Sequence, residues 1–368
     1  MKKVLFYKKS NLIGSAGGVE KVLVTLSNAL AQKGYAVYLT TRDKKEGTPF
    51  FAVSSQVKFH RFQIKFSSFR RFLGKIGFSF FSYFNRELLI SKIIQKYINE
   101  NKIDVIITAG IQDMGDILYS SSLPQKKVVM LHSRPDVYFT KKKEKYFIDI
   151  LKKVDLVQVL LPSFVPIIQK YYQGPVEVIG NAISLNAFTN KREKIIIYPA
   201  RIEKDKQQHL LIEAFSKISA IFPDWKIHFR GGVADTEYFN VLNGLVEKYG
   251  LQKQVVFLKP TPNLDIEFSK CSLCVFPSKY EGFPLGLCEA MASGLPVIGF
   301  QTASGVCDLI LPNENGFLAS DVDDFSLKIK ILLEDDALRM RLGENAKNIA
   351  LTYNEKIIIS KWMEVINA

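Results

Sequence analysis

Short apolar runs alternate along the chain with longer segments in which apolar residues recur every three or four positions. The runs at 3–7, 36–40, 105–108, 128–131, 156–160 and 176–179 are rich in β-branched and aromatic residues, which is typical of buried strands. Between the first two runs, residues 19–33 place an apolar residue on one helical face at each turn and end before Gly34. This alternation predicts βα units with parallel sheets.

A second series of the same kind follows the polar stretch 181–194. It predicts strands at 195–198, 226–230, 255–257, 273–276 and 296–299, with a first helix at 209–222. A chain of 368 residues is long for a single core. We therefore expect an α/β fold of two Rossmann-like, doubly wound parallel-sheet domains, at 1–183 and 184–352, with a last helix at 353–368 that returns to the first domain.

The positive charge lies in the first half of the chain. Residues 1–185 hold 29 Lys and Arg against 13 Asp and Glu, a balance of +16, whereas the remainder holds 21 against 23. A field of this sign on one half favours an anionic surface or substrate.

Residues 58–98 interrupt the regular alternation. They hold nine Lys and Arg, one acidic residue (Glu87) and many phenylalanines, a mixture typical of contact with lipid headgroups. The alternative is that the phenylalanines pack onto the first domain; no recognisable nucleic-acid module surrounds the segment. The residues expected at this membrane or acceptor surface are Arg61, Lys65, Arg70, Arg71 and Lys75.

The segment 276–298 carries the most informative pattern. A strand ends near Phe276, a loop with Gly282 and Pro284 follows, and a helix is predicted at 285–293. A glycine-bearing loop that enters a helix leaves backbone N–H groups free at the positive end of the helix dipole, which suits anions and sugar hydroxyls. Glu281 and Glu289 lie eight positions apart at the two ends of this turn, where their carboxylates can accept hydrogen bonds from a polyol.

This segment resembles the Glu-x7-Glu motif of the retaining glycosyltransferases of family four, which have the GT-B fold. The resemblance covers nearly the whole chain. It extends to the loop Gly17-Gly18-Val19-Glu20, the strand end Leu131-His132-Ser133, the pair Arg201 and Lys206, and a last helix with Trp362.

The resemblance implies a role for each of these residues. Arg201 and Lys206 would bind the diphosphate, and His132 would approach the donor sugar from the other side of the cleft. Glu289 would hold the ribose, and Gly17 and Gly18 would let the backbone come close to the reacting centre. Glu281 would hold the donor sugar together with the backbone of the loop residues Phe283, Pro284, Leu285 and Gly286.

The implied function is transfer of a hexose or N-acetylhexosamine from a nucleotide diphosphate sugar, preferably a UDP-sugar, with retention of configuration. The acceptor would be a lipid-linked or cell-envelope glycan, met in the cytoplasm at the anionic inner face of the membrane. No metal, cofactor or nucleic acid is expected. Two alternatives stay open: a sugar-nucleotide epimerase of the same fold, and a non-catalytic nucleotide-sugar-binding protein.

Three positions depart from the family pattern or need a separate interpretation. Gln207 stands where a glycine usually follows the lysine, and Asp308 stands where glutamate is frequent. Asp321-Val322-Asp323 has the Asp-x-Asp pattern of metal sites in another glycosyltransferase fold. Because apolar helical spacing follows it, we interpret it as the N-cap of a surface helix.

Overall fold

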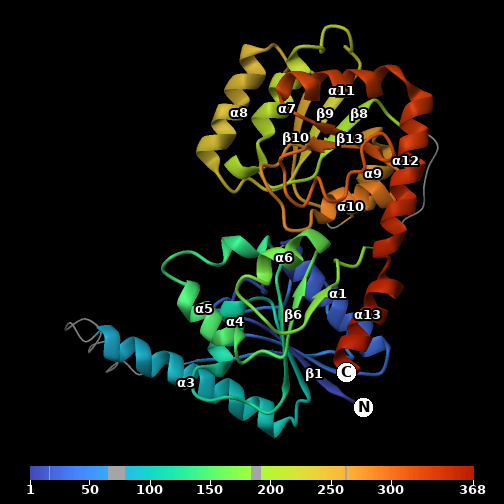
Figure 1. Ribbon diagram of the computed structural model, residues 1–368. Coiled ribbons are helices and arrows are strands. Elements are labelled where there is room, and N and C mark those ends of the chain that lie inside the picture. Colours follow the sequence, from blue (N-terminus) through green and yellow to red (C-terminus); the bar gives the residue numbers. More distant parts are fainter. Residues whose placement is uncertain (16, 65–78, 184–191, 262) are drawn as a thin grey trace. The chain divides into compact units, whose positions relative to one another are not determined.

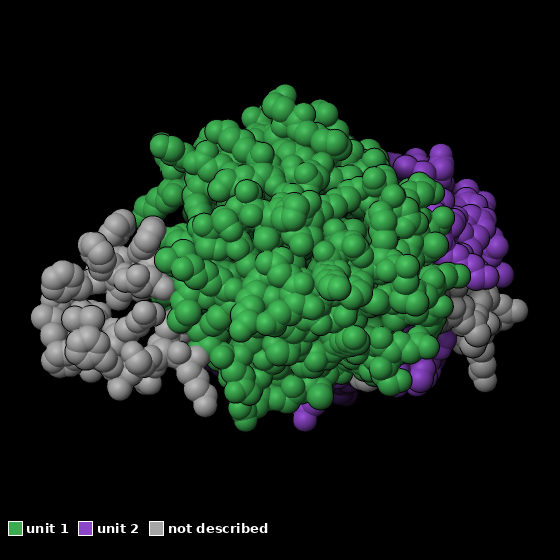
Figure 2. Space-filling view, turned by 90° about the horizontal axis from the view of Figure 1, so that it is seen from below, with its two compact units in different colours: residues 1–182, 358–368 green, residues 183–357 purple. Residues whose placement is uncertain are grey.

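The computed structural model describes residues 1–368 except 16, 65–78, 184–191 and 262, and it leaves the side chains of 79–85 undescribed. The described chain divides into two compact units (Figures 1 and 2). Unit 1 is Met1–Ala182 together with Ile358–Ala368, and unit 2 is Ile183–Ile357.

Unit 1 is built on a seven-stranded sheet in the order β3-β2-β1-β4-β5-β6-β7, and its strand pairs are parallel. The central strands are buried on both faces, because helices cover the sheet, which explains their uninterrupted apolar runs. The elements are β1 (Lys3–Lys8), α1 (Gly18–Gln32), β2 (Ala36–Thr41), β3 (Lys58–Arg61), α3 (Ser79–Glu100), β4 (Val105–Thr108), α4 (Ile111–Leu118), β5 (Lys126–Met130), η1 (Pro135–Val137), α5 (Glu144–Leu151), β6 (Leu156–Val159), η2 (Pro162–Phe164), α6 (Val165–Ile168) and β7 (Val176–Val178).

Unit 2 repeats the design with a six-stranded sheet in the order β10-β9-β8-β11-β12-β13, again with parallel pairs. Its elements are β8 (Ile195–Tyr198), η3 (Lys204–Lys206), α7 (Gln208–Ser216), β9 (Lys226–Arg230), α8 (Thr236–Lys248), β10 (Val255–Leu258), α9 (Leu264–Lys270), β11 (Leu273–Phe276), α10 (Leu285–Ala292), β12 (Val297–Phe300), β13 (Gly316–Ala319), α11 (Val322–Glu334), α12 (Asp336–Ala350) and η4 (Leu351–Tyr353). The last helix, α13 (Glu355–Asn367), starts in unit 2 and belongs to unit 1 from Ile358 onward. The predicted α/β class with two parallel sheets is confirmed.

The end of the chain, Ile358–Ala368, belongs to unit 1. Trp362 of α13 is 2% exposed. The ammonium of Lys2 donates to the carbonyl oxygen of Ile366 at 2.8 Å, and that of Lys126 donates to the carbonyl oxygen of Val365 at 2.7 Å. Lysine side chains near a helix C-terminus satisfy carbonyls that have no partner within the helix.

From the sequence we expect residues 58–98 to interrupt the regular alternation of strands and helices. This expectation is wrong at both ends of the segment, which form regular elements of unit 1. Residues 58–61 form the edge strand β3, which pairs with β2. Ile90, Ile94 and Ile98 of α3 are fully buried at four-residue spacing. Edge strands bury little, and the sequence Lys58-Phe59-His60-Arg61 is mostly polar, so the strand pattern escaped detection.

Candidate functional site

Each sheet has one position where the order of the strands reverses, and ligands in open α/β sheets bind beyond the carboxyl ends of the strands at such a point. In unit 2 it lies between β8 and β11, and in unit 1 between β1 and β4. The predicted residues Arg201 and Lys206 follow β8, and Glu281 follows β11. The topology therefore brings together groups that are 75 residues apart in the chain.

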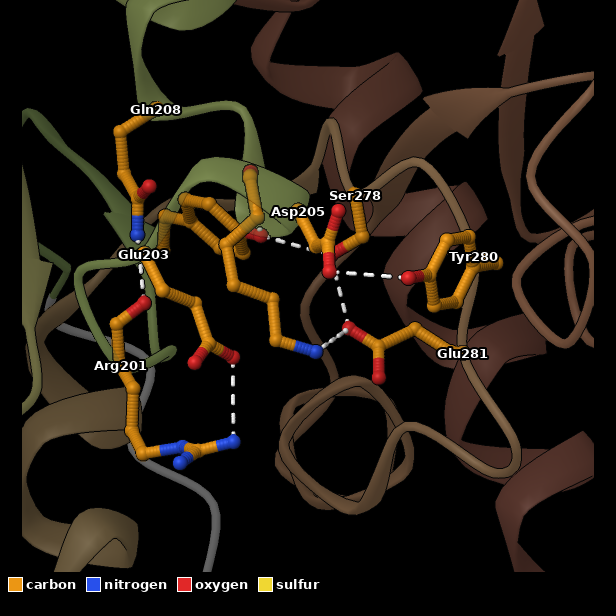
Figure 3. A network of polar contacts seen from close by, with 9 residues as sticks. Arg201, Glu203, Asp205, Gln208, Ser278, Tyr280 and Glu281 are labelled. Atoms are coloured by element: carbon orange, nitrogen blue, oxygen red, sulfur yellow. Dashed lines mark hydrogen bonds and ion pairs between the residues drawn. The ribbon is translucent and has the colours of Figure 1, made fainter. Parts of the chain in front are cut away.

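Lys206 and Glu281 form the centre of the unit 2 site (Figure 3). The Lys206 ammonium lies 2.8 Å from Glu281 Oε1, and the two side chains are 18% and 14% exposed. Ser278 Oγ donates to the same carboxylate oxygen at 2.7 Å. The ammonium is thus held in place by a carboxylate whose position is itself fixed.

Residues that the sequence interpretation missed support this pair. The Tyr198 hydroxyl, at the end of β8, lies 2.6 Å from Ser278 Oγ and donates to the Lys206 carbonyl oxygen at 2.8 Å. Its burial, with a further contribution from Glu281, raises the pKa of Tyr198 well above its ordinary value. Asp205 accepts a hydrogen bond from the Tyr280 hydroxyl at 2.8 Å. Tyr198 and Ser278 sit at the carboxyl ends of predicted strands, which is the signal that could have identified them.

Arg201 lies in the same loop but is open to solvent. Its side chain is 66% exposed and pairs with Glu203 at 3.1 Å. The backbone beneath it is fixed, because the side-chain amide of Gln208 donates to the Arg201 carbonyl oxygen at 2.7 Å. Figure 3 shows the Arg201 guanidinium directed at the Glu203 carboxylate.

Gln207 explains why the family favours glycine after the lysine. It has φ 50° and ψ 40°, in the left-handed region. Such a conformation is costly for residues with a Cβ and free of that penalty for glycine. The loop therefore keeps the turn that leads into α7 although the residue differs.

The predicted donor loop Phe283–Gly286 leads into α10. The helix begins at Leu285 after Pro284, and no side chain caps its first turn. Gly286 approaches the end of β8 so closely that an added Cβ would lie 2.9 Å from Pro199 Cγ. Glu289 lies one turn further along α10 and is 8% exposed. Glu281, the loop amides and Glu289 thus belong to one continuous segment, the loop after β11 and the helix α10.

His132 and Gly17 lie in unit 1, at the carboxyl edge of its sheet. His132 follows β5, and its Nε2 is buried without a hydrogen-bond partner among the described residues. Burial, and then the Lys8 charge, lowers the pKa of His132 to about 4, so the imidazole is neutral at pH 7. Gly17 precedes α1, which begins at Gly18, and an added Cβ at Gly17 would lie 2.1 Å from Glu20 Oε2. Glu20 in turn pairs with Lys8 at 3.2 Å.

A buried ionic network occupies the rest of the unit 1 switch point. Asp116 of α4 accepts from Arg42 Nε at 2.7 Å and from the Tyr7 hydroxyl at 2.9 Å, and its second oxygen lies 3.3 Å from the Lys9 ammonium. The Arg42 and Asp116 side chains are 9% and 3% exposed. The sequence interpretation missed this network, whose members are up to 109 residues apart.

Asp113 lies one turn before Asp116. Its carboxylate accepts from the Lys9 backbone N–H at 3.3 Å. The pKa of Asp113 is raised to about 7, mainly because the carboxyl group is buried. The charge of Lys8 acts in the opposite direction and lowers this pKa. A perturbed carboxyl at a switch point is a candidate for function.

The predicted membrane or acceptor residues are only partly described. Arg61, the last residue of β3, has a side chain that is 19% exposed and pairs with Glu46 at 3.0 Å. Lys65, Arg70, Arg71 and Lys75 lie outside the described residues. Within the described part of the chain, no helix is both long and apolar enough to cross a membrane.

Asp321 is the N-cap of α11, as predicted. It accepts from the Asp324 backbone N–H at 2.9 Å. Of the several interactions that lower the pKa of Asp321, the hydrogen bond from the Asp324 backbone N–H has the largest effect. Across the residues that the structure describes, no three His, Cys, Asp or Glu side chains are grouped so that they could hold a metal ion.

Comparison with known protein families gives two matches that follow each other along the chain. The model of Glycosyltransferase Family 4 matches residues 16–187, and that of Glycosyl transferases group 1 matches residues 181–349. An uncharacterized glycosyltransferase of Haemophilus influenzae is 24% identical over the full length of both chains. The poly(ribitol-phosphate) alpha-N-acetylglucosaminyltransferase of Staphylococcus aureus is 28% identical over 75% of this chain and 57% of its own length.

Solved structures share the fold over the whole chain. The sucrose-phosphate synthase of Thermosynechococcus elongatus superposes with a TM-score of 0.80 at 20% identity, covering 100% of this chain and 98% of its own. HepE of Anabaena, in complex with UDP and glucose, superposes with a TM-score of 0.77 at 19% identity and covers both chains fully.

Proposed function

The chain belongs to the family-four glycosyltransferases, which have the GT-B fold, and we propose that it transfers a hexose or N-acetylhexosamine from a UDP-sugar to a lipid-linked or cell-envelope glycan. The observation that carries this proposal is the Lys206–Glu281 pair at the switch point of unit 2, with Arg201 in the same loop. Two cations, and a carboxylate that can accept hydrogen bonds from a polyol, at the point where open α/β sheets bind ligands support this proposal.

The chemistry requires cations at this point. When the bond between the anomeric carbon and the phosphate oxygen breaks, negative charge develops on the diphosphate and positive charge on the sugar. Preorganised positive groups at the leaving group are the largest catalytic contribution available. Lys206, positioned by Glu281, supplies one such positive group, and Arg201 supplies the other. The same two cations, Arg201 and Lys206, lead us to propose that transfer is independent of a metal ion.

The diphosphate would leave, and the acceptor hydroxyl would attack, on the same face of the sugar. The acceptor hydroxyl gives its proton to the departing phosphate oxygen as its own oxygen bonds to the anomeric carbon, and the configuration is retained. No carboxylate nucleophile is then needed. In this scheme Glu281 and the amides of Phe283, Leu285 and Gly286 hold the donor sugar, and Glu289 holds the ribose. In unit 1, His132, Gly17 and Gly18 are the residues that we propose take part in the reaction.

Thermal stabilisation by nucleotides tests the donor assignment. We expect UDP to raise the unfolding temperature more than GDP, ADP or CMP, equally in magnesium and in EDTA, because ligands that bind only the folded state stabilise it. Glu289→Ala should abolish the effect of UDP. Glu247→Ala, an exposed glutamate on α8 of the same unit, is the matched control and should retain it. If no nucleotide stabilises the protein, the proposal fails.

Product analysis separates transfer from the two alternatives. An epimerase would convert the UDP-sugar into its epimer without an acceptor, and a binding protein would leave it intact. We expect UDP release that depends on an added envelope glycan extract, detected by chromatography of the nucleotide products.

The acceptor and the place of reaction form a second part of the proposal. The charge of the first half of the chain and the basic, aromatic segment 58–98 support peripheral association with the inner face of the membrane. Replacing Arg70, Arg71 and Lys75 by Glu should reduce co-sedimentation with phosphatidylglycerol vesicles. Replacing Lys141, Lys142 and Lys143 by Glu changes the charge equally and is the control, and an equal loss in both variants would contradict a specific role for the segment.

A further inference from the structure

A second basic surface lies on unit 1, outside the segment 58–98. We call it the α5 lysine strip, and it consists of Lys141, Lys142, Lys143, Lys145, Lys152 and Lys153. All six are exposed, and the stretch 141–153 contains only Glu144 and Asp149 as acidic residues. The single ion pair among these described residues joins Lys152 to Asp149 at 3.2 Å, an exposed pair worth little. The strip thus concentrates positive charge that the protein itself does not neutralise.

The chain connects the end of β5, where His132 lies, to the strip through a loop that is anchored on unit 1. The chain runs from His132 through η1 to α5, and the Tyr138 hydroxyl within this loop bonds to Ser133 and to the backbone of His132. Phe139 then stacks on Tyr171, with ring centroids 3.7 Å apart and planes at 5°. These contacts anchor the chain segment that leads into the strip.

The helix α5 is also packed tightly on α4, which carries Asp113 and Asp116. An added Cβ at Gly115 would lie 2.5 Å from the Tyr146 hydroxyl oxygen and 2.7 Å from Ile150 Cδ1. The two helices therefore approach as closely as a glycine allows, and they lie side by side in Figure 1. The lysines project from a rigid support.

The chemistry of the strip indicates an anionic chain and disfavours a bilayer. Helices that lie in a membrane interface present apolar side chains to the lipid. Here Phe147, Ile150 and Leu151 are buried in unit 1, and Tyr146 is the one large apolar side chain of 141–153 that is exposed, at 44%. Single-stranded nucleic acids need several aromatic platforms for base stacking, which the strip does not offer.

We propose that the α5 lysine strip binds an anionic acceptor polymer, a chain of phosphodiester-linked or similarly charged units, whose charged units lie along the strip. The inference rests on the proposed transferase function, because it identifies the class of acceptor. Charge complementarity carries it: unneutralised lysines on a fixed support match repeated negative charges, and binding releases the counterions of the polymer.

Fluorescence anisotropy with end-labelled inorganic polyphosphate tests the inference on the full chain. Replacing Lys141, Lys142, Lys143 and Lys145 by Gln should weaken binding at least tenfold at moderate salt. It should also reduce the slope of log Kd against log salt concentration by roughly three, since each phosphate contact contributes about 0.7–0.9. The matched control replaces four exposed lysines elsewhere in unit 1, Lys33, Lys44, Lys45 and Lys92, by Gln and should change the affinity less than twofold.

Equal losses in the two variants, or no loss in either, would overturn the inference. So would an equal loss of phosphatidylglycerol vesicle binding by the strip variant, which would assign the strip to the membrane. Stabilisation by UDP is measured on the same samples. If the strip variant is stabilised by UDP and still binds polyphosphate like the unmodified chain, only this inference is refuted. If the unmodified chain is not stabilised by UDP but binds polyphosphate through the strip, only the donor proposal is refuted.

Discussion

The switch points of the two units have the same topology and use their charges differently. In unit 2, Lys206 and Glu281 are 18% and 14% exposed, and Arg201 is 66% exposed. In unit 1, the Arg42 and Asp116 side chains are 9% and 3% exposed, and the Tyr7 hydroxyl and the Lys9 ammonium also contact Asp116. One site keeps cations available to a ligand, while the other uses its cations to satisfy a buried carboxylate.

The difference follows from the cost of removing charge from water. A buried ion pair loses its hydration and repays the loss only when every group has partners, so such a network is fixed. A partly exposed pair can be opened at low cost when a diphosphate arrives. We infer that the residual reactive groups of unit 1 are those outside the Asp116 network, namely His132, Lys8 and Asp113.

The largest expected effect concerns the closed network. Asp116→Ala leaves the Arg42 guanidinium and the Lys9 ammonium without their carboxylate, and we expect a loss of about 3–5 kcal/mol in the free energy of unfolding. Urea unfolding measures it. Glu281→Ala in unit 2 is the comparison and should lose less, because the Lys206 and Glu281 side chains are more exposed, at 18% and 14%, than those of Arg42 and Asp116. Equal losses would remove the distinction between the two switch points.

For the transfer rate, in contrast to stability, we expect the larger effect in unit 2. Lys206→Ala should reduce the transfer rate about 10²–10³-fold, because one preorganised group at the leaving diphosphate is lost. The unfolding temperature should change little, since no core volume is removed. Lys204→Ala is the control: it lies in the same 3₁₀ turn, its side chain is 71% exposed, and it should remain active. Near-normal turnover of the Lys206 variant would refute its assigned role.

Asp113 should make the stability of unit 1 depend on pH. Its pKa is about 7 in the folded chain and near 3.8 when unfolded, so the folded state binds the proton more tightly. Stability is then greatest below about pH 4 for this group and falls as the pH rises to 7. A full shift of about three units corresponds to roughly 4 kcal/mol, and with partial solvation we expect about 2 kcal/mol. Asp113→Asn should flatten this dependence in urea unfolding between pH 5 and pH 8, and an unchanged slope would contradict the assignment.

The smallest effect concerns the left-handed turn of unit 2. Gln207→Gly should stabilise the chain by about 0.5 kcal/mol, because relief of the backbone strain at φ 50° slightly exceeds the entropy that glycine gains when unfolded. Gln208→Gly is the control. It lies in α7, donates to the Arg201 carbonyl oxygen, and should destabilise the chain instead. A destabilised Gln207→Gly variant would show that the side chain, rather than the turn, decides this position.

Sequence periodicity located most of the strands correctly because their signal is local. The predicted strands 105–108, 195–198, 226–230 and 273–276 coincide with β4, β8, β9 and β11. Each is a short apolar or β-branched run bounded by polar residues, and no distant contact is needed to recognise it. The edge strand β3 escaped, because a partly exposed strand carries a weaker apolar pattern. The four-residue strand β13 (Gly316–Ala319) escaped as well, although its sequence is apolar.

The candidate site was predictable where its residues share one turn. Glu281 and Glu289 with the loop into α10 form a local motif, and so does the N-cap at Asp321. The pairing of Lys206 with Glu281 and the seating of Ser278 between Tyr198 and Glu281 were not predictable from local pattern. They depend on which strands become neighbours.

The sequence by itself therefore determined the α/β class, the succession of two similar units and the residues that carry the family's motifs. Only the tertiary structure decided which charges are enclosed and which stay open, since Tyr7, Arg42 and Asp116 meet across 74 and 109 residues of chain. Strand order in a parallel sheet is set by crossover connections and by the collective burial of both faces, and no single segment encodes it.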